Sequence, residues 1–435
     1  MTSDTVTAQL VLGGLQLTSE LGVDFVAADI EHFQFLDAIL SYSQTSALYS
    51  APTYTGDGNA NLMTGSTREE IFEALGGNDW INPGGGADTI DGGEGHDMVS
   101  FYNLPNTPGR TNVEYRLDID LSAGTGVNHD GSEQLQLSNV ERVTGTVFAD
   151  RIKGDAGDNE LRGLGDYDWF IATEGNDTID GGTGQDMLSF LDYQSSAANV
   201  VADIFSSNGL PPSGTQASGL VVDLANPANN TGLAAGLDLT SIERITGSGR
   251  QDVFYGDDGE NDFRGLGDYD WFVSSEGGRE RYFGGDGIDT VTYYNAGAGI
   301  IANLSNGARV NGQETGYGSG GVAARDLYFE IENLVGSRFD DELRGSLGRN
   351  QLNGLEGDDF IFGYGGVDYL KGGLGDDVID GGGGSDYALF DGNAADYTLT
   401  RSGNEVTVTG ADGTDRLVDV EYFRFDDVTL DIWNL

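Results

Sequence analysis

The sequence predicts an all-β fold made of four right-handed parallel β-roll blocks, separated by β-strand connectors and flanked by similar β-caps at the two ends. Three observations predict it. A nine-residue pattern of oxygen-bearing and apolar side chains recurs in Gly-rich sequence, strand-like runs lie between the recurrences, and two related segments stand near the ends. Few helical signals occur in the 435 residues.

The nine-residue pattern is clearest in residues 84–101, GGGADTIDGGEGHDMVSF. Asp88 and Asp97 stand nine apart, and Ile90 or Val99 follows two places on. Steps of nine, taken in four blocks, find 21 such units with an oxygen side chain at position 6 and an apolar residue at position 8. Fifteen of the position-6 residues are Asp: Asp79, Asp88, Asp97, Asp150, Asp168, Asp177, Asp186, Asp252, Asp270, Asp289, Asp341, Asp359, Asp368, Asp377 and Asp386.

Short strands and Gly turns explain this spacing. A strand of about three residues points one side chain inward, which is position 8, and a Gly-rich turn then reverses the chain. Two nonapeptides complete one flattened coil. Stacked coils align the Asp side chains and turn carbonyls in rows of hard oxygens, the ligands that Ca²⁺ prefers. The 15 Asp residues are therefore predicted calcium ligands, and multiple ions replace the missing hydrophobic core.

Four nonapeptides carry a family resemblance: GGEGHDMVS (92–100), GGTGQDMLS (181–189), GGDGIDTVT (284–292) and GGLGDDVID (372–380). They resemble the GGxGxDxUx repeat of haemolysin-type (RTX) calcium-binding proteins. The resemblance implies a parallel β-roll, type I secretion from a bacterium and folding outside the cell on calcium. It also implies an uncleaved C-terminal export signal, which DDVTLDIWNL resembles.

The blocks depart from the pattern to different degrees. Block three contains EGGRERYF (276–283), with one extra residue and Arg279 and Arg281 where other blocks carry Asn, Asp or Thr. We expect calcium to be missing from the middle of this block. Block four has an unbroken Asp run and Gly at every position 4, so we expect the tightest binding there.

Three related segments, NVERVTG (139–145), SIERITG (241–247) and EIENLVG (330–336), each lead into a block from a connector with strand-like alternation. Residues 29–40 also align with residues 419–430, which predicts the same β-cap at both ends. The predicted divisions are an N-terminal cap, four rolls with three connectors between them, and a C-terminal cap with the export signal: 1–55, 56–100, 101–144, 145–190, 191–246, 247–292, 293–335, 336–390 and 391–435.

The third nonapeptide of every block has an aromatic residue at position 7: Trp80, Trp169, Trp271 and Phe360. Position 7 neighbours the inward residue and is expected to face outward. These rings either dock the adjoining connector onto the roll or form stacking platforms for sugar rings.

Composition excludes several classes of partner. The chain has 72 acidic against 21 basic residues, a formal charge of −51, and no Cys. Such a field repels nucleic acid and anionic membranes and attracts cations. No stretch approaches the roughly 20 apolar residues of a membrane span. The opening MTSDTVTAQL lacks the basic start and apolar run of a signal peptide.

No catalytic motif is recognisable. The chain lacks HExxH and GxSxG, so the zinc-protease and lipase sites of related proteins are missing. We expect a non-enzymatic calcium-folded structural or adhesive protein, with calcium as ligand and self-assembly through the caps. Two alternatives remain open: a carbohydrate-active or polysaccharide-binding protein, and a secreted toxin or bacteriocin.

Overall fold

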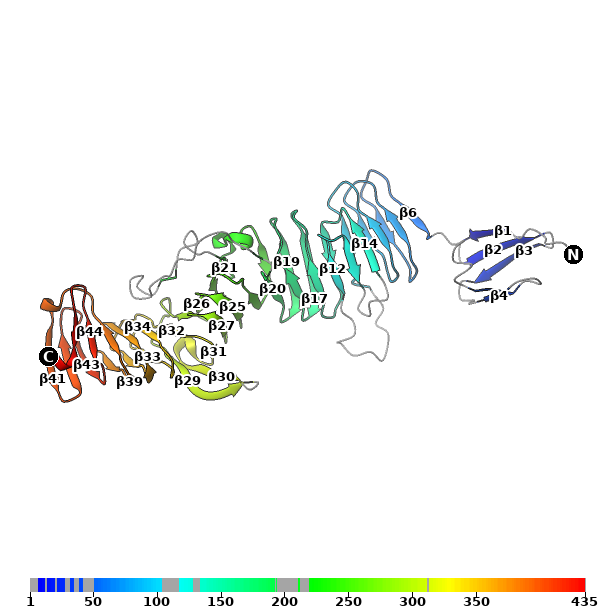
Figure 1. The fold of residues 1–435 in the computed structure, drawn as a ribbon. Helices are drawn as coiled ribbons and strands as arrows, with labels where there is room; N and C mark the ends of the chain where they lie inside the picture. Colours follow the sequence, from blue (N-terminus) through cyan, green and yellow to red (C-terminus); the bar gives the residue numbers. More distant parts are fainter. Residues whose placement is uncertain are drawn as a thin grey trace. The chain divides into compact units, whose positions relative to one another are not determined.

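The computed structural model describes residues 51–103, 117–127, 134–191, 193, 210–211, 219–310 and 313–434, and the backbone of five strands before residue 51. The described part consists of β-strands and short 3₁₀ turns and contains no α-helix (Figure 1). No helix in these ranges is long and apolar enough to cross a membrane. The all-β class and the parallel roll are thereby confirmed.

The chain divides into two compact units, residues 1–99 with 133–140, and residues 100–132 with 141–435. In the first unit, two parallel ladders form the roll of block one. One ladder contains β6 (Thr53–Thr55), β8 (Ile71–Glu73), β10 (Thr89–Asp91) and β14 (Gln134–Ser138). The other contains β7 (Leu62–Thr64), β9 (Trp80–Asn82) and β11 (Met98–Ser100).

The second unit contains four longer parallel ladders. The first has β12 (Asp118–Asp120), β16 (Arg151–Lys153), β18 (Trp169–Ile171), β20 (Met187–Ser189), β23 (Arg244–Thr246), β25 (Asp262–Asp268), β27 (Arg281–Gly287) and β31 (Leu327–Phe329). The second has β15 (Arg142–Thr144), β17 (Glu160–Asp166), β19 (Thr178–Gly184) and β22 (Asp238–Thr240).

The other two ladders carry blocks three and four to the C-terminal end. One has β21 (Val221–Asp223), β24 (Val253–Tyr255), β26 (Trp271–Val273), β28 (Thr290–Thr292), β32 (Asn333–Val335), β34 (Gln351–Glu356), β37 (Tyr369–Leu374), β40 (Tyr387–Leu389) and β44 (Tyr422–Arg424). The other has β29 (Ile301–Val310), β33 (Glu342–Arg344), β35 (Phe360–Phe362), β38 (Val378–Asp380) and β43 (Thr414–Val418).

Antiparallel strands and short turns complete the second unit. The strands are β13 (Thr125–Val127), β30 (Gln313–Gly320), β41 (Thr398–Ser402), β42 (Glu405–Thr409) and β45 (Thr429–Asp431). Two short parallel pieces are β36 (Gly365–Gly366) and β39 (Gly383–Gly384). The 3₁₀ turns are η3 (Pro227–Asn229), η4 (Gly232–Ala234), η5 (Gly321–Ala323), η6 (Ala394–Asp396) and η7 (Ile432–Asn434).

The connectors are woven into the roll and do not merely separate its blocks. Strand β23, from SIERITG, pairs in parallel with β20 of block two and with β25 of block three. Strand β32 likewise joins β28 of block three to β34 of block four. Blocks two to four therefore share one continuous stack.

The two terminal regions pair their strands in the same register. In the N-terminal region β1 (Thr7–Val11), β2 (Gly14–Ser19) and β3 (Gly22–Ala27) form an antiparallel sheet, and β4 (His32–Gln34) and β5 (Ile39–Ser41) form a hairpin. The C-terminal β41, β42 and β43 and the hairpin β44–β45 repeat this pattern. Phe33 pairs with Leu40 as Phe423 pairs with Leu430, so the aligned residues occupy matching places.

The inward direction of position 8 is also confirmed. Twenty of its 21 residues are at most 1% exposed, and Met63 is 7% exposed. At position 7 the outcome is mixed, because Trp80 and Phe360 are about half exposed while Trp271 is buried. Trp271 packs against Val221 of the connector strand β21, as the docking interpretation expects for block three.

Candidate metal centre

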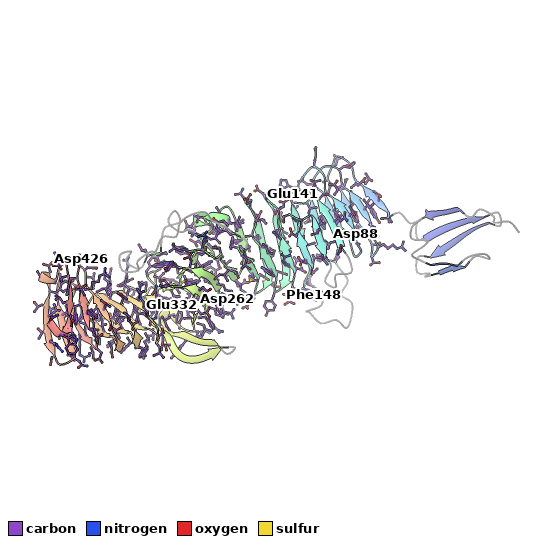
Figure 2. The ribbon with its side chains drawn as sticks, in the orientation of Figure 1. Asp88, Glu141, Phe148, Asp262, Glu332 and Asp426 are labelled. Carbon is purple, nitrogen blue, oxygen red and sulfur yellow. The ribbon has the colours of Figure 1, made fainter. Side chains whose placement is uncertain are left out.

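All 15 Asp residues predicted as calcium ligands lie inside the roll, at most 2% exposed. Because every second nonapeptide returns to the same edge, these side chains form rows, and each carboxylate reaches the coil before its own. The main-chain N–H of Asp168 donates to Oδ1 of Asp186 at 2.8 Å. The N–H of Asp368 donates to Oδ1 of Asp386 at 2.9 Å. The same main-chain-to-carboxylate hydrogen bond joins most coils. Figure 2 draws the side chains along the ribbon and labels Asp88 of these rows.

Connector and cap residues continue the rows, and sequence reasoning missed them. Glu243, Glu332 and Glu421 accept the N–H groups of Asp186, Asp289 and Asp386, each at 2.9 Å. Asp326 and Asp415 do the same for Glu280 and Asp377. A signal was present for two of them, since Glu243 and Glu332 lie nine residues before Asp252 and Asp341 and so occupy position 6.

The rows contain two kinds of carboxylate. In the first kind, one oxygen accepts a main-chain N–H, and the other is buried with no hydrogen-bond partner in the described part of the chain. Such an oxygen is costly unless a cation takes it. This kind comprises Asp79, Asp168, Asp186, Asp270, Asp289, Asp359, Asp368, Asp377 and Asp386.

In the second kind, protein donors occupy both oxygens. Asp252 accepts the N–H of Leu220 at 2.7 Å on Oδ1 and the N–H of Ser248 at 2.6 Å on Oδ2. The Ser248 hydroxyl adds further bonds to both oxygens. Asp150 and Asp341 are held in the same way by Thr146 and Ser337. Asp177 belongs here as well, through Asn159 and Thr173.

Asp88 and Asp97 continue the rows of block one. They accept the N–H groups of Glu70 and Asp79 at 2.8 and 2.7 Å.

The Gly-rich turns leave no room for a side chain beside these rows. A Cβ on Gly184 would lie 1.6 Å from the carbonyl oxygen of Asp166, and one on Gly384 equally close to that of Gly366. Gly384 also has a φ of +154°, which L side chains rarely adopt. The turns thus bring carbonyl oxygens of successive coils against one another, which only Gly permits.

Burial makes the ionised form of these acids costly. It raises the pKa of Asp168, Asp289 and Asp359 to about 8, and that of Asp368 to about 7. Neighbouring carboxylates in the same rows raise it further, whereas the main-chain N–H hydrogen bonds lower it. In the fold without a cation, these groups therefore hold protons near neutral pH.

The donor set fits Ca²⁺. The half-used carboxylates and the turn carbonyls are hard oxygens, and no group of three or more His, Cys, Asp or Glu side chains gathers within the described ranges. Carboxylates alone would thus leave an ion short of ligands, and turn carbonyls would have to supply the rest. The ion would contribute the positive charge that permits the Asp rows to ionise.

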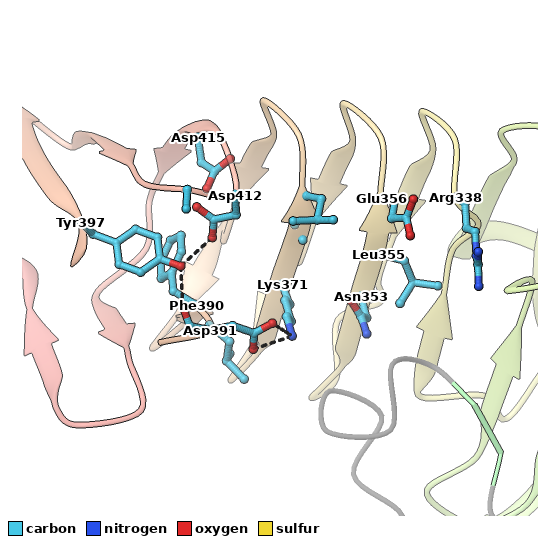
Figure 3. Close-up of a pocket in the computed structure, with 15 residues that line it drawn as sticks. Arg338, Asn353, Leu355, Glu356, Lys371, Phe390, Asp391, Tyr397, Asp412 and Asp415 are labelled. Atoms are coloured by element: carbon cyan, nitrogen blue, oxygen red, sulfur yellow. Dashed lines mark hydrogen bonds and ion pairs between the residues drawn. The ribbon is translucent and has the colours of Figure 1, made fainter. Parts of the chain in front are cut away.

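A separate hollow of about 460 Å³ lies against β34, β37 and the C-terminal cap (Figure 3). Several of its polar groups are paired with one another. Lys371 Nζ lies 2.8 Å from both carboxylate oxygens of Asp391. The Tyr397 hydroxyl lies 2.6 Å from the carbonyl oxygen of Asp391 and 2.7 Å from Oδ2 of Asp412.

The comparisons with known proteins agree with this geometry. The chain matches the family described as "RTX calcium-binding nonapeptide repeat (4 copies)" over residues 64–99, 139–169, 165–190, 240–272, 335–370 and 362–392. No curated protein matches it. The matched segments are the ones that carry the Asp rows, the inward apolar residues and the Gly turns. The chain therefore carries RTX calcium-binding nonapeptide repeats in these segments.

Proposed function

We propose that this calcium-binding repeat protein is secreted by a bacterium, folds on calcium outside the cell and has a structural or adhesive role without catalysis. Support for secretion is indirect, since RTX repeat proteins are typically secreted by bacteria. Support for calcium-coupled folding comes from the chain itself.

The single observation that carries the proposal is the buried row of half-used carboxylates. A chain of charge −51 places like charges side by side in a roll whose inward apolar side chains come from position 8 of each nonapeptide. Without a cation these acids must take up protons or repel one another, and the raised pKa values express that cost. Binding energy for the ion is then folding energy.

Circular dichroism of the whole chain tests this. We expect a largely unfolded spectrum in chelator at pH 8 and a β-rich one in millimolar calcium, the range of extracellular sites. Magnesium at the same concentration is the control, because it dehydrates reluctantly and demands a tighter octahedral shell. A β-rich spectrum that survives exhaustive chelation would refute calcium-coupled folding.

The structural role is supported by the two similar terminal regions. In the C-terminal cap, β43 and β44 extend the roll by parallel pairing with β38 and β40. We propose that the N-terminal region, which has the same strand register, can cover the roll of another copy, and that a contact of this kind builds filaments or lattices.

Light scattering and electron microscopy in calcium test assembly, with a chain shortened to begin at Thr53 as the comparison. A full-length chain that stays monomeric at high concentration would exclude assembly. A shortened chain that polymerises equally well would exclude the N-terminal region from it. Incubation with polysaccharides, scored for turnover against retention, separates an adhesive protein from a carbohydrate-active enzyme.

A further inference from the structure

Arg244 of the connector and Arg264 and Arg281 of block three surround one buried carboxylate, Asp262, on the outer face of neighbouring strands. Arg244, Asp262 and Arg281 are direct partners on β23, β25 and β27, and Arg264 lies two residues after Asp262. Together they line a hollow of about 500 Å³. Because the chain has only 21 basic residues against 72 acidic ones, a group of three neighbouring arginines is unusual.

The carboxylate does not saturate the guanidinium groups. The closest approaches to Asp262 are 3.8 Å from Nε of Arg244, 3.5 Å from Nε of Arg264 and 3.2 Å from Nη2 of Arg281. The Nε of Arg244 is buried with no hydrogen-bond partner in the described part of the chain. Three guanidiniums carry fifteen N–H donors in all, so most remain available to a ligand.

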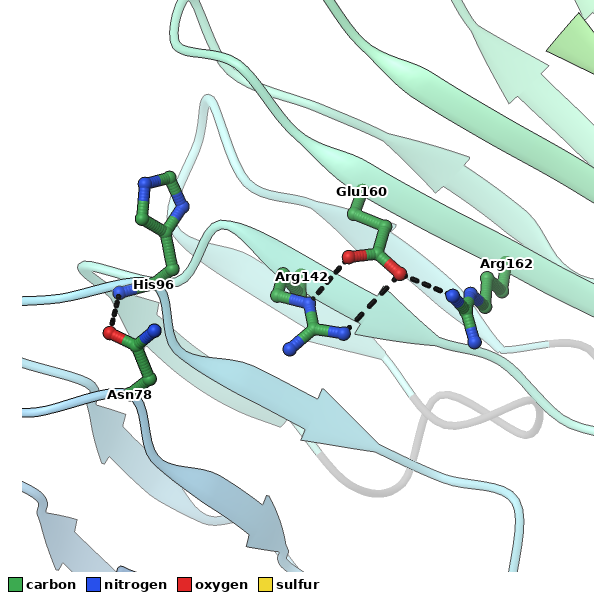
Figure 4. Close-up of polar contacts among 5 residues, drawn as sticks. All are labelled: Asn78, His96, Arg142, Glu160 and Arg162. Carbon is green, nitrogen blue, oxygen red and sulfur yellow. Dashed lines mark hydrogen bonds and ion pairs between the residues drawn. The ribbon is translucent and has the colours of Figure 1, made fainter. Parts of the chain in front are cut away.

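Block two carries the matched arrangement in a saturated form (Figure 4). There Glu160 replaces Asp262 and lies between Arg142 and Arg162. Its carboxylate accepts from Nε of Arg142 at 2.7 Å and from Nη2 of Arg162 at 2.5 Å. The longer Glu side chain reaches both arginines, and the shorter Asp262 does not.

The third arginine is particular to block three. The strand partner of Asp262 is Arg281, whereas the strand partner of Glu160 is Thr178. Two residues on, Phe283 stacks on Phe329 with centroids 4.3 Å apart, and the Arg264 guanidinium lies over Phe283 at 4.6 Å. Stacking holds this guanidinium in place before any ligand arrives, which lowers the entropic cost of binding.

The charge of the hollow selects the ligand. Three guanidiniums face two lining carboxylates, Asp262 and Glu330, which leaves one net positive charge. A monoanion balances this charge, whereas a phosphate dianion would leave an excess of negative charge. A carboxylate also matches the planar fork of Arg, which binds it through two parallel hydrogen bonds.

We propose that this arginine hollow binds the carboxylate of an acidic sugar residue, of the uronate class, in an extracellular polysaccharide. The inference rests on the proposed adhesive function and gives it a ligand. The arginines and Asp262 lie on the outer face of the strands, whereas the Asp rows lie inside, so the hollow is distinct from the rows.

Isothermal titration calorimetry of the whole chain in excess calcium tests the site, with a galacturonate trimer as probe and a neutral glucose trimer as control. The decisive variant, Asp262→Glu combined with Arg281→Thr, rebuilds the block-two arrangement inside block three. We expect it to weaken uronate binding by about tenfold or more, since charge-assisted hydrogen bonds are lost. The matched variant Arg142→Ala with Arg162→Ala leaves binding unchanged.

Each outcome bears on the proposal. Equal binding of the neutral trimer, or unchanged binding after Asp262→Glu with Arg281→Thr in a chain that circular dichroism shows to be folded, overturns it. Displacement of the trimer by an equal concentration of inorganic phosphate overturns the choice of a monocarboxylate. A chain that fails to fold in calcium contradicts the proposed function before any sugar is added, whereas a folded chain indifferent to uronate contradicts only the site.

Discussion

Blocks three and four share one stack but are stabilised by different means. Four of the five inward residues of block three are aromatic. The ring of Phe272 stacks on that of Phe254 with centroids 5.4 Å apart and lies 5.6 Å from that of Tyr282. In block four the inward residues are mostly Leu and Ile. Block three also buries Trp271 on its outer face, where Phe360 of block four is 50% exposed. Block three therefore has the larger apolar core.

The acidic rows differ in the opposite sense. Block four has four half-used carboxylates, Asp359, Asp368, Asp377 and Asp386, whereas block three has two, Asp270 and Asp289. In block three Asp252 is saturated by protein donors, and burial together with the neighbouring Asp326 raises the pKa of Glu280 in the fold without a cation. The same backbone can therefore be held by an apolar core or by cations, and each block emphasises one of them.

Removal of calcium is expected to have the largest effect on this contrast between blocks three and four. We expect amide hydrogen exchange in chelator to show loss of protection in block four that exceeds the loss in block three by about tenfold or more, because the aromatic core persists. Mass spectrometry of peptides from 247–292 and 336–390 measures it, with the calcium-loaded chain as control. Equal loss in both blocks would remove the basis of the comparison.

A lower pH should partly substitute for calcium in stabilising the fold. Burial raises the pKa of Asp359 to about 8 and that of Asp368 to about 7 from 3.8. The folded chain then binds more protons than the unfolded chain. Protonation of these two acids therefore stabilises the fold fully below about pH 4, and this stabilisation is lost as pH rises through about 7 to 8. Circular dichroism without calcium should show more β-structure at pH 5 than at pH 8. The reverse order would contradict it.

A pair of substitutions sharpens the ranking of ligands. Asp368→Ala removes a half-used carboxylate and should raise the calcium midpoint of folding by about fivefold. Asp252→Ala removes a carboxylate whose oxygens already bind Ser248 and Leu220, so it should lower stability with little change in the midpoint. Calcium titrations followed by circular dichroism measure both. Equal midpoints for the two variants would count against the division of the rows.

The smallest effect is expected at Glu280. Burial and the neighbouring Asp326 raise the pKa of the Glu280 carboxyl group, and the Ser275 hydroxyl already donates to its Oε1. Glu280→Gln keeps the shape of the side chain and should change the free energy of unfolding by less than about 1 kcal/mol. Asp359→Asn is the matched change in block four and should weaken calcium binding. Urea unfolding in calcium compares them, and a large loss for Glu280→Gln would mean that this carboxyl group ionises to hold an ion.

The roll could be predicted well because the nine-residue repeat shows both features that the roll requires, an inward apolar residue and an acid in each unit. The position-8 residues and the position-6 acids could be read off in register, and both sets are buried. The saturated acids could not be foreseen so easily, since that depends on a hydroxyl four residues earlier, at Thr146, Ser248 or Ser337. The arginine hollow depends on strand partners 18 and 19 residues apart, which only the register of the coils brings together.

The strand pairing of the connectors could not be predicted for a different reason. Strand β12 pairs with β16 and β29 pairs with β33 across stretches of more than 30 residues. Alternating residues indicate that such strands exist but not which neighbour each one chooses. Partner choice was set by the open edge of the adjacent coil, which is a tertiary property.

The hydrogen bonds accepted by the position-6 carboxylates all point the same way along the chain. Each of these carboxylates accepts an N–H from an earlier coil, and the last two coils obtain their acceptors, Asp415 and Glu421, from the C-terminal cap. The position-6 row of a coil is therefore complete only when the coil that follows it is in place. Loss of the cap would leave the N–H groups of Asp377 and Asp386 without these acceptors, so the row would fray from its carboxyl end.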